Sequence, residues 1–480
     1  MENNNNCRLS VVIEDEQTLL ETVYNRDKKE TNLVVADSDN QINLVGDYTD
    51  GRGGKYLPYP SDDALLQKGF IKLPSGLVEN LEIKKLYEDV CLFISRYVKI
   101  SDEFLTVSAV YVLLSWVYDR FHTLPYLRAI GDFGTGKSRF VDVVGNICYK
   151  PMFASSITTA GIFRTLDLIK GTLVLDEANF KSSEMWSEII KILNSGHSKG
   201  APVIRMNVNK KDGSFSPEIF EVFGPKILGS RERFGDDALE SRCLSYRFLP
   251  MKSGKSVHLP KDFEEVSIEL RNKLLAFRMN NFFQIQTNEA TLHDLEFPRL
   301  RQSALALTSM ASYIDGPVLE QVLSYLREYE QEIMDNQKSD IKVDILSCIL
   351  NLIGDEMMGD DKKEIKVYMQ AIKMRYGDSN NDYDWSDHKK YEKKEGDIWV
   401  YPVNVISARK IGSAVKNLGI KTFRDSEGFY IPVSREIKTI ELLARRYGLE
   451  LPWENNNQKK LPTDEPVTEE ELKEIGDVTF

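Results

Sequence analysis

The sequence has few cysteines and histidines, and none of them is spaced like a set of metal ligands. The five cysteines lie far apart without a C-x-x-C pair, and the five histidines show no ligand spacing. This pattern argues against a zinc ribbon and a redox-active dithiol. Scattered single cysteines are typical of buried thiols in a reducing compartment.

Long apolar runs and an excess of positive charge are also missing. The most apolar stretch, residues 105–118, is too short to span a bilayer, and no basic segment leads into an apolar one at the N-terminus. We therefore expect a cytoplasmic protein without a signal peptide or a membrane segment. The 62 Lys and Arg against 74 Asp and Glu give a net charge of −12, which argues against a general nucleic-acid coat but permits a local basic strip.

The composition divides the 480 residues into six expected segments. These are a polar, partly disordered arm with a few strands (1–78), a helical segment (79–124), an α/β core with a parallel sheet (125–250), a helical region with one break near 287–298 (251–335), a domain of further helices and strands (336–451) and a disordered tail (452–480). Short apolar strands alternate with helices in the core, which is typical of a sheet covered by helices on both faces. Its expected strands are Tyr126–Ile130, Met152–Ala154, Thr172–Leu175 and Lys226–Leu228.

A complete phosphate-binding loop follows the first of these strands. It matches G-x-x-x-x-G-K-[ST] and consists of Gly131, Asp132, Phe133, Gly134, Thr135, Gly136, Lys137 and Ser138. Glycines let the backbone amides turn toward phosphate oxygens, and the following helix directs its positive end at them. Lys137 is expected to reach the β- and γ-phosphates of ATP, and the Ser138 hydroxyl to bind Mg²⁺.

An acidic pair ends a second apolar strand, in the run L-V-L-D-E. Asp176 is expected to hold Mg²⁺, and Glu177 to polarise the attacking water as a general base. A base beside the metal-binding Asp separates hydrolytic motors from switch GTPases and small kinases.

A β-hairpin is expected between the acidic strand and the strand at 226–228. Val203–Asn209 alternates like a strand, and the turn Lys210-Lys211-Asp212-Gly213 ends in a D-G pair, a strong hairpin signal. This arrangement resembles the pre-sensor hairpin of AAA+ replicative helicases, such as the MCM proteins and the superfamily 3 viral helicases. The resemblance, good over residues 120–310, implies an AAA+ P-loop NTPase core with a helical lid. It also implies that Lys210 and Lys211 grip DNA at the hairpin tip.

The same resemblance assigns three further residues near the nucleotide. Ser230 occupies the place of a polar sensor of the γ-phosphate, although these ATPases often have Asn there. Arg242, in A-L-E-S-R-C, resembles the MCM arginine finger that completes a neighbour's site, with Arg231 and Arg233 as competing candidates. Arg301, in P-R-L-R-Q-S, resembles the γ-phosphate-sensing arginine of the lid helix, with Arg299 as the second choice.

A second DNA-binding element is expected near the C-terminus. In the helix 407–418, Ile411, Ala414, Val415 and Leu418 face inward, while Arg409, Lys410 and Lys416 face outward. Two strands with Arg424 on the first of them follow, so that the whole resembles a winged helix. The resemblance implies that residues 336–451 form a winged-helix DNA-binding domain. Residues 409–446 contain nine basic and four acidic residues, which favours contact with phosphates.

The sequence therefore predicts a DNA translocase or helicase that uses ATP and Mg²⁺ and acts in the replication of a mobile element. We expect it to assemble as a homo-oligomeric ring, a hexamer. Two alternatives stay open, which are a DNA-bound ATPase that loads or regulates without unwinding and a protein-remodelling AAA+ machine. The Lys-Lys turn disfavours the second alternative, because remodelling machines present aromatic pore loops. A non-motor ATP switch would stay monomeric.

Overall fold

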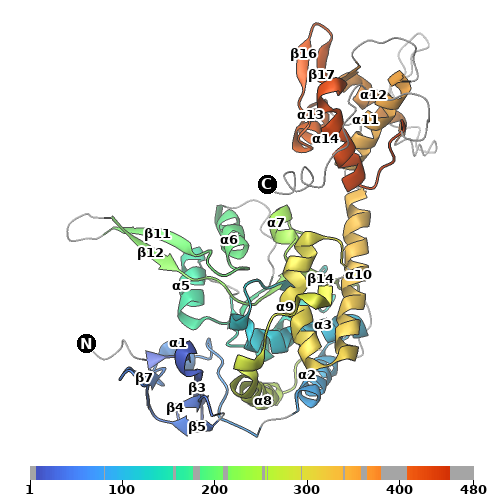
Figure 1. Ribbon diagram of the computed structural model, residues 1–480. Helices are drawn as coiled ribbons and strands as arrows, with labels where there is room; N and C mark the ends of the chain where they lie inside the picture. The colour runs from blue at the N-terminus through green and yellow to red at the C-terminus, as the bar shows by residue number, and fades with distance from the viewer. Residues whose placement is uncertain are drawn as a thin grey trace. The chain divides into compact units, whose positions relative to one another are not determined.

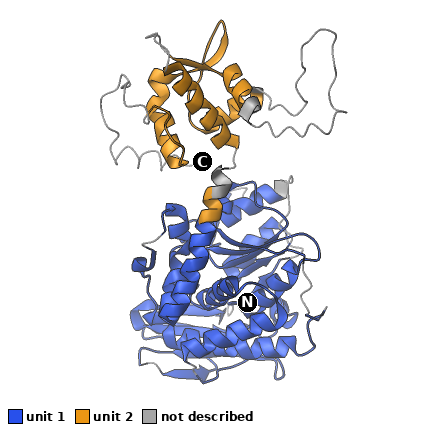
Figure 2. Cartoon of the chain, turned by 90° about the vertical axis from the view of Figure 1, so that its right-hand side faces the viewer, with its two compact units in different colours: residues 1–330 blue, residues 331–480 orange. Residues whose placement is uncertain are grey.

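The computed structural model divides the chain into two compact units, Met1–Glu330 and Gln331–Phe480 (Figure 2). The structure describes residues 7–39, 41–79, 82–154, 158–176, 184–208, 215–250, 255–256, 258–292, 295–338, 341–357, 365–379 and 408–453. Within these ranges, no helix is both long and apolar enough to cross a membrane.

The first unit begins with two small sheets, where the composition predicted a loose, partly disordered arm. The strands and short helices are β1 (Cys7–Arg8), β2 (Ser10–Ile13), η2 (Glu14–Glu16), β3 (Thr18–Asn25), β4 (Glu30–Ala36), β5 (Ile42–Val45), β6 (Tyr48–Thr49), β7 (Lys55–Pro58) and α1 (Ala64–Gln67). One sheet has the order β2-β3-β4-β5 and the other the order β1-β7-β6. The sequence analysis expected a few strands in this segment, and its described part has them. They form two sheets, and β3 is buried over most of its length.

A buried ion network ties β3 to the helices of the first unit. The Glu21 carboxylate, only 2% exposed, lies 3.1 Å from Lys150 Nζ and 2.8 Å from Arg278 Nε. Arg278 also pairs with Asp119 at 2.7 Å. Burial alone would raise the pKa of Glu21, but Lys150 and Arg278 outweigh it and hold that pKa below its usual value. The N-terminal sheet is therefore part of the body of the first unit.

Two helices precede the central sheet, as the sequence predicts. They are α2 (Ile83–Tyr97) and α3 (Asp102–Trp116), followed by η3 (Tyr118–Arg120). The Ser101 side chain accepts a hydrogen bond from Phe104 N at 3.3 Å and so caps the start of α3. Most of α3 is buried, so this helix lies in the interior and its apolar run is a core sequence.

The central sheet has five parallel strands in the order β14-β8-β13-β10-β9. The strands are β8 (Tyr126–Ile130), β9 (Met152–Phe153), β10 (Leu173–Leu175), β13 (Lys226–Ser230) and β14 (Cys243–Arg247). The four strands expected from the sequence are confirmed within one or two residues. Because β13 lies between β8 and β10, the ends of the phosphate-loop strand and the acidic strand are separated by one strand.

Helices cover both faces of this sheet, as expected for an α/β fold. They are α4 (Lys137–Ile147), α5 (Thr159–Ile169) and α6 (Glu184–Ser195). Leu173 and Leu175 join the apolar cluster that contains α5 and α6 residues. Val174 points the other way, and a Cβ atom added at Gly145 of α4 would lie 3.0 Å from its side chain. Successive strand residues therefore alternate between the two helical layers.

A two-stranded hairpin extends from the sheet beyond α5 and α6 (Figure 1). It consists of β11 (Val203–Val208) and β12 (Phe215–Phe220), paired antiparallel with Val203 opposite Phe220. The expected hairpin is therefore confirmed. Its predicted tip, including Lys210 and Lys211, lies outside the described residues.

Helices form the rest of the first unit. They are α7 (Asp237–Glu240), α8 (Phe263–Asn281), η4 (Phe282–Gln284), η5 (Glu289–Leu292), α9 (Pro298–Ile314) and α10 (Gly316–Lys338). The helical break expected near residues 287–298 falls between η4 and α9. The boundary between the two units lies within α10, slightly before the expected position at residue 335.

The second unit contains helices and a three-stranded antiparallel sheet. Its elements are α11 (Ile341–Met357), β15 (Lys366–Tyr368), α12 (Met369–Ser379), α13 (Ala408–Asn417), β16 (Phe423–Asp425), β17 (Gly428–Pro432) and α14 (Val433–Arg446). The strands have the order β15-β17-β16. The predicted inward face of α13 is confirmed, because Ile411, Ala414, Val415 and Leu418 are buried.

The buried network predicts a large stability loss for Glu21→Gln. When the Glu21 carboxylate is removed, the positive charges of Lys150 and Arg278 stay buried beside each other and lose the negative charge that they share. This loss lowers the free energy of unfolding by about 3–5 kcal/mol. Urea unfolding at neutral pH measures this loss, with Glu30→Gln on the exposed start of β4 as the matched control. The depressed pKa means that the stabilisation is present above the usual glutamate pKa and is lost as the pH falls through the lower, folded-state pKa. Equal stability of the two variants would contradict the assignment.

Candidate functional site

The phosphate-binding loop lies between the end of β8 and the start of α4, which confirms the predicted strand–loop–helix context. Gly134 and Gly136 have φ angles of +75° and +95°, a region that favours glycine. A Cβ atom at Gly131 would lie 2.7 Å from Thr135 Oγ1 and 2.8 Å from the Phe248 carbonyl oxygen. The three glycines are therefore required by backbone geometry and by close packing.

Hydrogen bonds hold this loop in a fixed shape. The Gly131 amide donates to the Ser230 carbonyl at 3.0 Å, and Thr135 Oγ1 donates to the Asp132 carbonyl at 2.8 Å. Amides in the first turn of a helix have no partner within the helix, so the start of α4 is suited to an anion. The Lys137 side chain is 6% exposed, while Ser138 lies at the surface. The loop therefore presents amides, an ammonium group and a hydroxyl to one place.

The acidic strand brings Asp176 to the same edge of the sheet. Lys137 Nζ and Asp176 Oδ1 are 3.9 Å apart. Between β8 and β10, the backbone of Gly229 approaches Asp176 so closely that an added Cβ atom would lie 2.2 Å from Oδ1. The structure thus joins two predicted residues, Lys137 and Asp176, and adds Gly229, which the sequence analysis missed. A glycine within the apolar strand K-I-L-G-S was the available signal. The predicted base, Glu177, lies outside the described residues.

Ser230 is placed at the end of β13, beside the phosphate loop. Its side chain is fully buried, and its hydroxyl donates to the Glu232 carbonyl at 2.8 Å. Its carbonyl accepts the Gly131 amide. In this structure Ser230 therefore fixes the start of the loop through its backbone, while its hydroxyl is engaged with the following turn. Its role as a phosphate sensor stays a prediction.

A second carboxylate that the sequence analysis missed lies near Asp176. Asp142 is on α4, one helical turn after Ser138. Desolvation raises the pKa of Asp142 to about 6, and the negative charge of Asp176 adds to the shift. A second carboxylate therefore lies close enough to Asp176 for the two charges to interact.

A cavity of about 220 Å³ opens beside the phosphate loop. Tyr97 and Val98, at the end of α2, face Thr135 and Gly136 across it, and the remaining wall includes the segment that follows β14. Within that wall the ring of Tyr246 stacks on Phe104 at 4.6 Å. Beside its aromatic rings the cavity has the basic side chains of Lys99, Arg139 and Lys255. Aromatic surface and positive charge next to a phosphate loop have the chemistry of a nucleotide site. Its residues come from separate parts of the chain and form no sequence motif.

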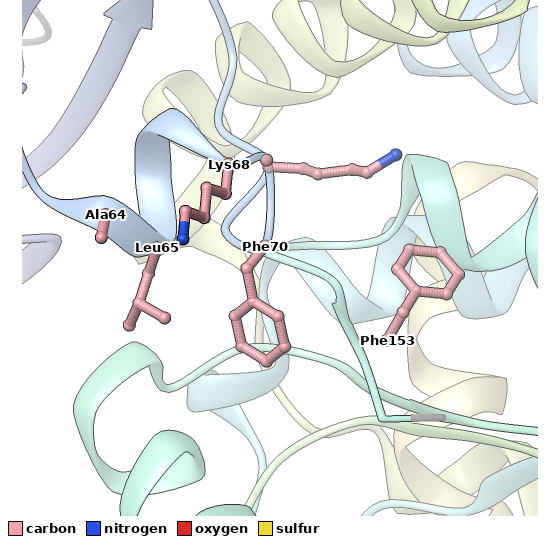
Figure 3. A pocket seen from close by; sticks show the side chains of 7 residues that line it. Ala64, Leu65, Lys68, Phe70 and Phe153 are labelled. Carbon is pink, nitrogen blue, oxygen red and sulfur yellow. The ribbon is translucent and has the colours of Figure 1, made fainter. Parts of the chain in front are cut away.

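A larger cavity, of about 620 Å³, lies between α1 and β9. Figure 3 shows Leu65 and Phe70 on one side of it and Phe153 on the other. The ammonium group of Lys72, which also lines it, is bound to Glu264 at 2.9 Å and to Asn146 near the C-terminal end of α4. This cavity is at the opposite end of α4 from the phosphate loop, so its size does not make it the nucleotide site.

The predicted arginine finger is held within its own chain in this structure. Arg242 donates to Asn194 Oδ1 at 2.8 Å and to the Ala238 carbonyl. Desolvation, with the nearby charge of Arg299, lowers its pKa below the usual arginine value. A role in a neighbour's site would require the side chain to leave these contacts, and it stays a prediction.

The alternative arginines differ in their surroundings. The Arg231 guanidinium lies 3.6 Å from the ring centre of Phe133, in the phosphate loop. Arg233 is 3.8 Å from Glu240. Arg301 and Arg299 are exposed in the first turns of α9. Arg231 is therefore the candidate that touches the phosphate loop directly.

The two strands of the hairpin have an exposed apolar face. Ile204, Met206, Phe215 and Ile219 are 56–68% exposed. Ile204 is opposite Ile219 in the pairing, so these side chains share one face. On the other face, Phe220 packs against Phe163 of α5 at 4.7 Å.

The predicted DNA-binding residues of the second unit lie at its surface. Arg409, Lys410 and Lys416 are exposed on α13, and Arg424 is exposed on β16. The Arg424 guanidinium lies 5.4 Å from the ring centre of Phe429. Helix and strand therefore each present basic side chains to solvent, as predicted, while DNA contact by them stays a prediction.

The close approach at Gly229 predicts that Gly229→Ala lowers ATP hydrolysis by about 100-fold, because displacement of a reacting group by 1 Å costs about that much. The added Cβ atom would push the Asp176 carboxylate from its place beside Lys137. Steady-state ATPase assays with Mg²⁺ measure the effect. Gly235→Ala is the control, since a Cβ atom there meets nothing within 4 Å. Equal activity of the two variants would refute the placement of Asp176.

No protein-family model and no curated protein sequence matches this chain. Among solved structures, it is similar to the active helicase Cch of SCCmec type IV, with 11% identity, a TM-score of 0.36, and coverage of 90% of this chain and 99% of that one. The NrS-1 C-terminal region (305–718) is 11% identical, with a TM-score of 0.32 and coverage of 86% of this chain and 96% of that one. The ORC1 protein of Aeropyrum pernix in complex with DNA is 12% identical, with a TM-score of 0.21 and coverage of 72% of this chain and 93% of that one. These similarities are too distant to assign a function, which therefore rests on the site geometry of the chain itself.

Proposed function

We propose that this protein is a Mg²⁺-dependent ATPase of the AAA+ type that moves along DNA and separates its strands. The observation that supports it most directly is the meeting of Lys137 and Asp176, 3.9 Å apart at the carboxyl edge of a parallel sheet. Ligands of such sheets bind outside the carboxyl ends of the strands. The adjacent cavity, which combines aromatic and basic side chains, supports a nucleoside triphosphate rather than free phosphate.

The residues present suit Mg²⁺. Ser138 offers a hydroxyl oxygen and Asp176 a carboxylate oxygen, and Mg²⁺ is usually held by one or two carboxylates together with water and substrate phosphates. Among the described residues there is no group of three or more His, Cys, Asp or Glu side chains that would hold a metal by itself. A metal that arrives with the nucleotide fits this donor set. When bound, it would neutralise charge on the phosphates.

Hydrolysis would proceed by attack of water on the γ-phosphorus, with cleavage of its bond to the bridging oxygen and release of ADP and phosphate. Lys137 would hold the β- and γ-phosphates, and Glu177 would accept the proton from the attacking water. The loop amides and the start of α4 would orient the phosphates without rearrangement, because Gly131 and Thr135 are already hydrogen-bonded in place.

The proposed motor acts as a homo-oligomeric ring, with a hexamer as the working assembly. Arg242 would complete the site of the neighbouring subunit after leaving Asn194. Arg301 would sense the γ-phosphate from the helical lid. These roles come from the resemblance to MCM and superfamily 3 helicases, and the surface position of Arg301 is compatible with its role.

DNA is the proposed polymer substrate. The order α11, β15, α12, α13, β16 and β17 in the second unit supports a winged helix whose basic surface contacts phosphates. The hairpin supports a second contact, with Lys210 and Lys211 at its tip. Replication of a mobile element is the proposed setting. A DNA-bound ATPase that loads or regulates other proteins is the alternative, and it would hydrolyse ATP on DNA without displacing a strand.

ATP-dependent strand displacement on 3′- and 5′-tailed forks tests this proposal, together with the mass of the assembly. The wild-type protein should displace the strand only when ATP and Mg²⁺ are both present. Glu177→Gln should still bind ATP, while turnover falls by about 100-fold or more. Turnover by the wild-type protein without displacement on either fork would favour the loader or regulator. Unchanged turnover in Glu177→Gln would refute the assignment of the base.

The hairpin contact predicts that combined Lys210→Ala and Lys211→Ala substitutions uncouple hydrolysis from unwinding. Loss of two phosphate contacts weakens DNA binding and reduces its salt dependence by about two counterions. Fork unwinding should fall at least about tenfold while ATP turnover without DNA is retained. Lys28→Ala with Lys29→Ala, in the turn between β3 and β4, is the matched charge control. Wild-type unwinding by the hairpin variant would rule out this contact.

A further inference from the structure

The side chain of Lys226 is fully buried at the start of β13 and is not used by the proposed reaction. Its ammonium group donates to the carbonyls of Gly196 at 3.0 Å, Val222 at 3.0 Å and Gly224 at 2.8 Å. An ammonium group has three donors, so each of them has a carbonyl partner. Burial lowers the pKa of this lysine to about 7.

The three carbonyls belong to the two ends of the hairpin insertion. Gly196 directly follows α6 and precedes β11, whereas Val222 and Gly224 follow β12. One ammonium group thus joins the segments by which the chain enters and leaves the hairpin. The Gly224 amide also donates to the Gly196 carbonyl at 3.2 Å, so the base of the hairpin is closed by a direct bond and by Lys226.

Packing leaves no room for a different arrangement at this point. A Cβ atom added at Gly196 would lie 2.6 Å from Lys226 Nζ and 2.6 Å from the Val222 carbonyl oxygen. On its other side, the ammonium lies 5.1 Å from the ring centre of Tyr126. The Lys226 backbone is held by Tyr111, whose hydroxyl accepts from the Lys226 amide at 2.8 Å.

The opposite end of the same strand touches the nucleotide site. Gly229 lies against Asp176, and the Ser230 carbonyl binds the first amide of the phosphate loop. The distance from Lys226 to Ser230 along an extended strand is about 13 Å. A buried strand in the middle of a sheet is stiff, so movement at one end is transmitted to the other.

We propose that Lys226 is a positioning residue that fastens the base of the β11–β12 hairpin to β13, so that the hairpin follows changes at the nucleotide site. This inference rests on the proposed function in one respect, which is that movement of the hairpin acts on DNA. Lys226 touches neither nucleotide nor DNA and acts through the carbonyls of residues 196, 222 and 224.

Amide hydrogen exchange on the full-length wild-type protein, with and without ATPγS and Mg²⁺, tests the connection first. Exchange in residues 196–202 and 221–225 should change when nucleotide binds. In Lys226→Met, these segments should exchange about tenfold faster, as expected from the loss of buried hydrogen bonds, and should no longer respond to nucleotide. Nucleotide binding shown by calorimetry, without any exchange response in the wild-type protein, would overturn the proposal.

Turnover separates positioning from simple destabilisation. Lys226→Met should keep the KM for ATP and the DNA-independent kcat within about twofold, but should lose most of the stimulation by DNA. Lys150→Met removes another buried lysine, at 2% exposure, and should retain DNA stimulation. Proportional loss of basal and stimulated turnover in Lys226→Met would show a structural role alone.

A second variant covers failure of Lys226→Met to fold. Gly196→Ala keeps the lysine but displaces its ammonium group and should reproduce the faster exchange and the loss of DNA stimulation. Normal coupling in that variant would contradict the proposal. The wild-type protein could show the exchange response at the hairpin base and yet neither respond to DNA nor displace a strand. That result would support the role of Lys226 and refute the helicase assignment.

Discussion

The Asp176 carboxylate lies so close to the Gly229 backbone that no side-chain atom fits between them. Strand β13 pairs with both β10 and β8 and so sets the spacing between the acidic strand and the phosphate loop. A larger residue in place of Gly229 would push the Asp176 carboxylate from its position 3.9 Å from Lys137. The chemistry of the site therefore depends on a residue that contributes no functional group.

The local features of this site follow from the sequence. The phosphate loop, its flanking strand and helix, and the hairpin could be predicted because each depends on residues close together in the chain. Glycine spacing reports backbone turns, and the inward face of α13 repeats at the helical period. These signals need no knowledge of which other segment packs against them.

The missed features depend on contacts between distant segments. Glu21 and Arg278 are 257 residues apart in the chain. The sequence of β3 therefore does not distinguish the buried Glu21 from a polar residue on the exposed face of a strand. The cavity beside the phosphate loop combines Tyr97 with residues around Phe248, and neither segment has a motif. The packing of the N-terminal strands into two sheets was missed for a related reason, because their short lengths and polar turns resemble an unfolded composition.

Strand β13 has a polar contact at each end, and both contacts are made by or to backbone atoms. At one end a carbonyl receives the phosphate-loop amide, and at the other an ammonium group gathers three carbonyls. Backbone contacts of this kind restrict position more strictly than contacts between flexible side chains. Both ends of the strand are closed to solvent, since Lys226 and Ser230 are each fully buried.

The exposed apolar face of the hairpin has a consequence for the protein in solution. Ile204, Met206, Phe215 and Ile219 form a strip on a two-stranded ribbon, and such strips promote adhesion between chains. Adhesion through apolar groups is not screened by added salt, and it weakens on cooling. Association between chains in concentrated samples should therefore be reduced more by cooling than by added salt. Contacts made by charges alone would respond in the opposite way.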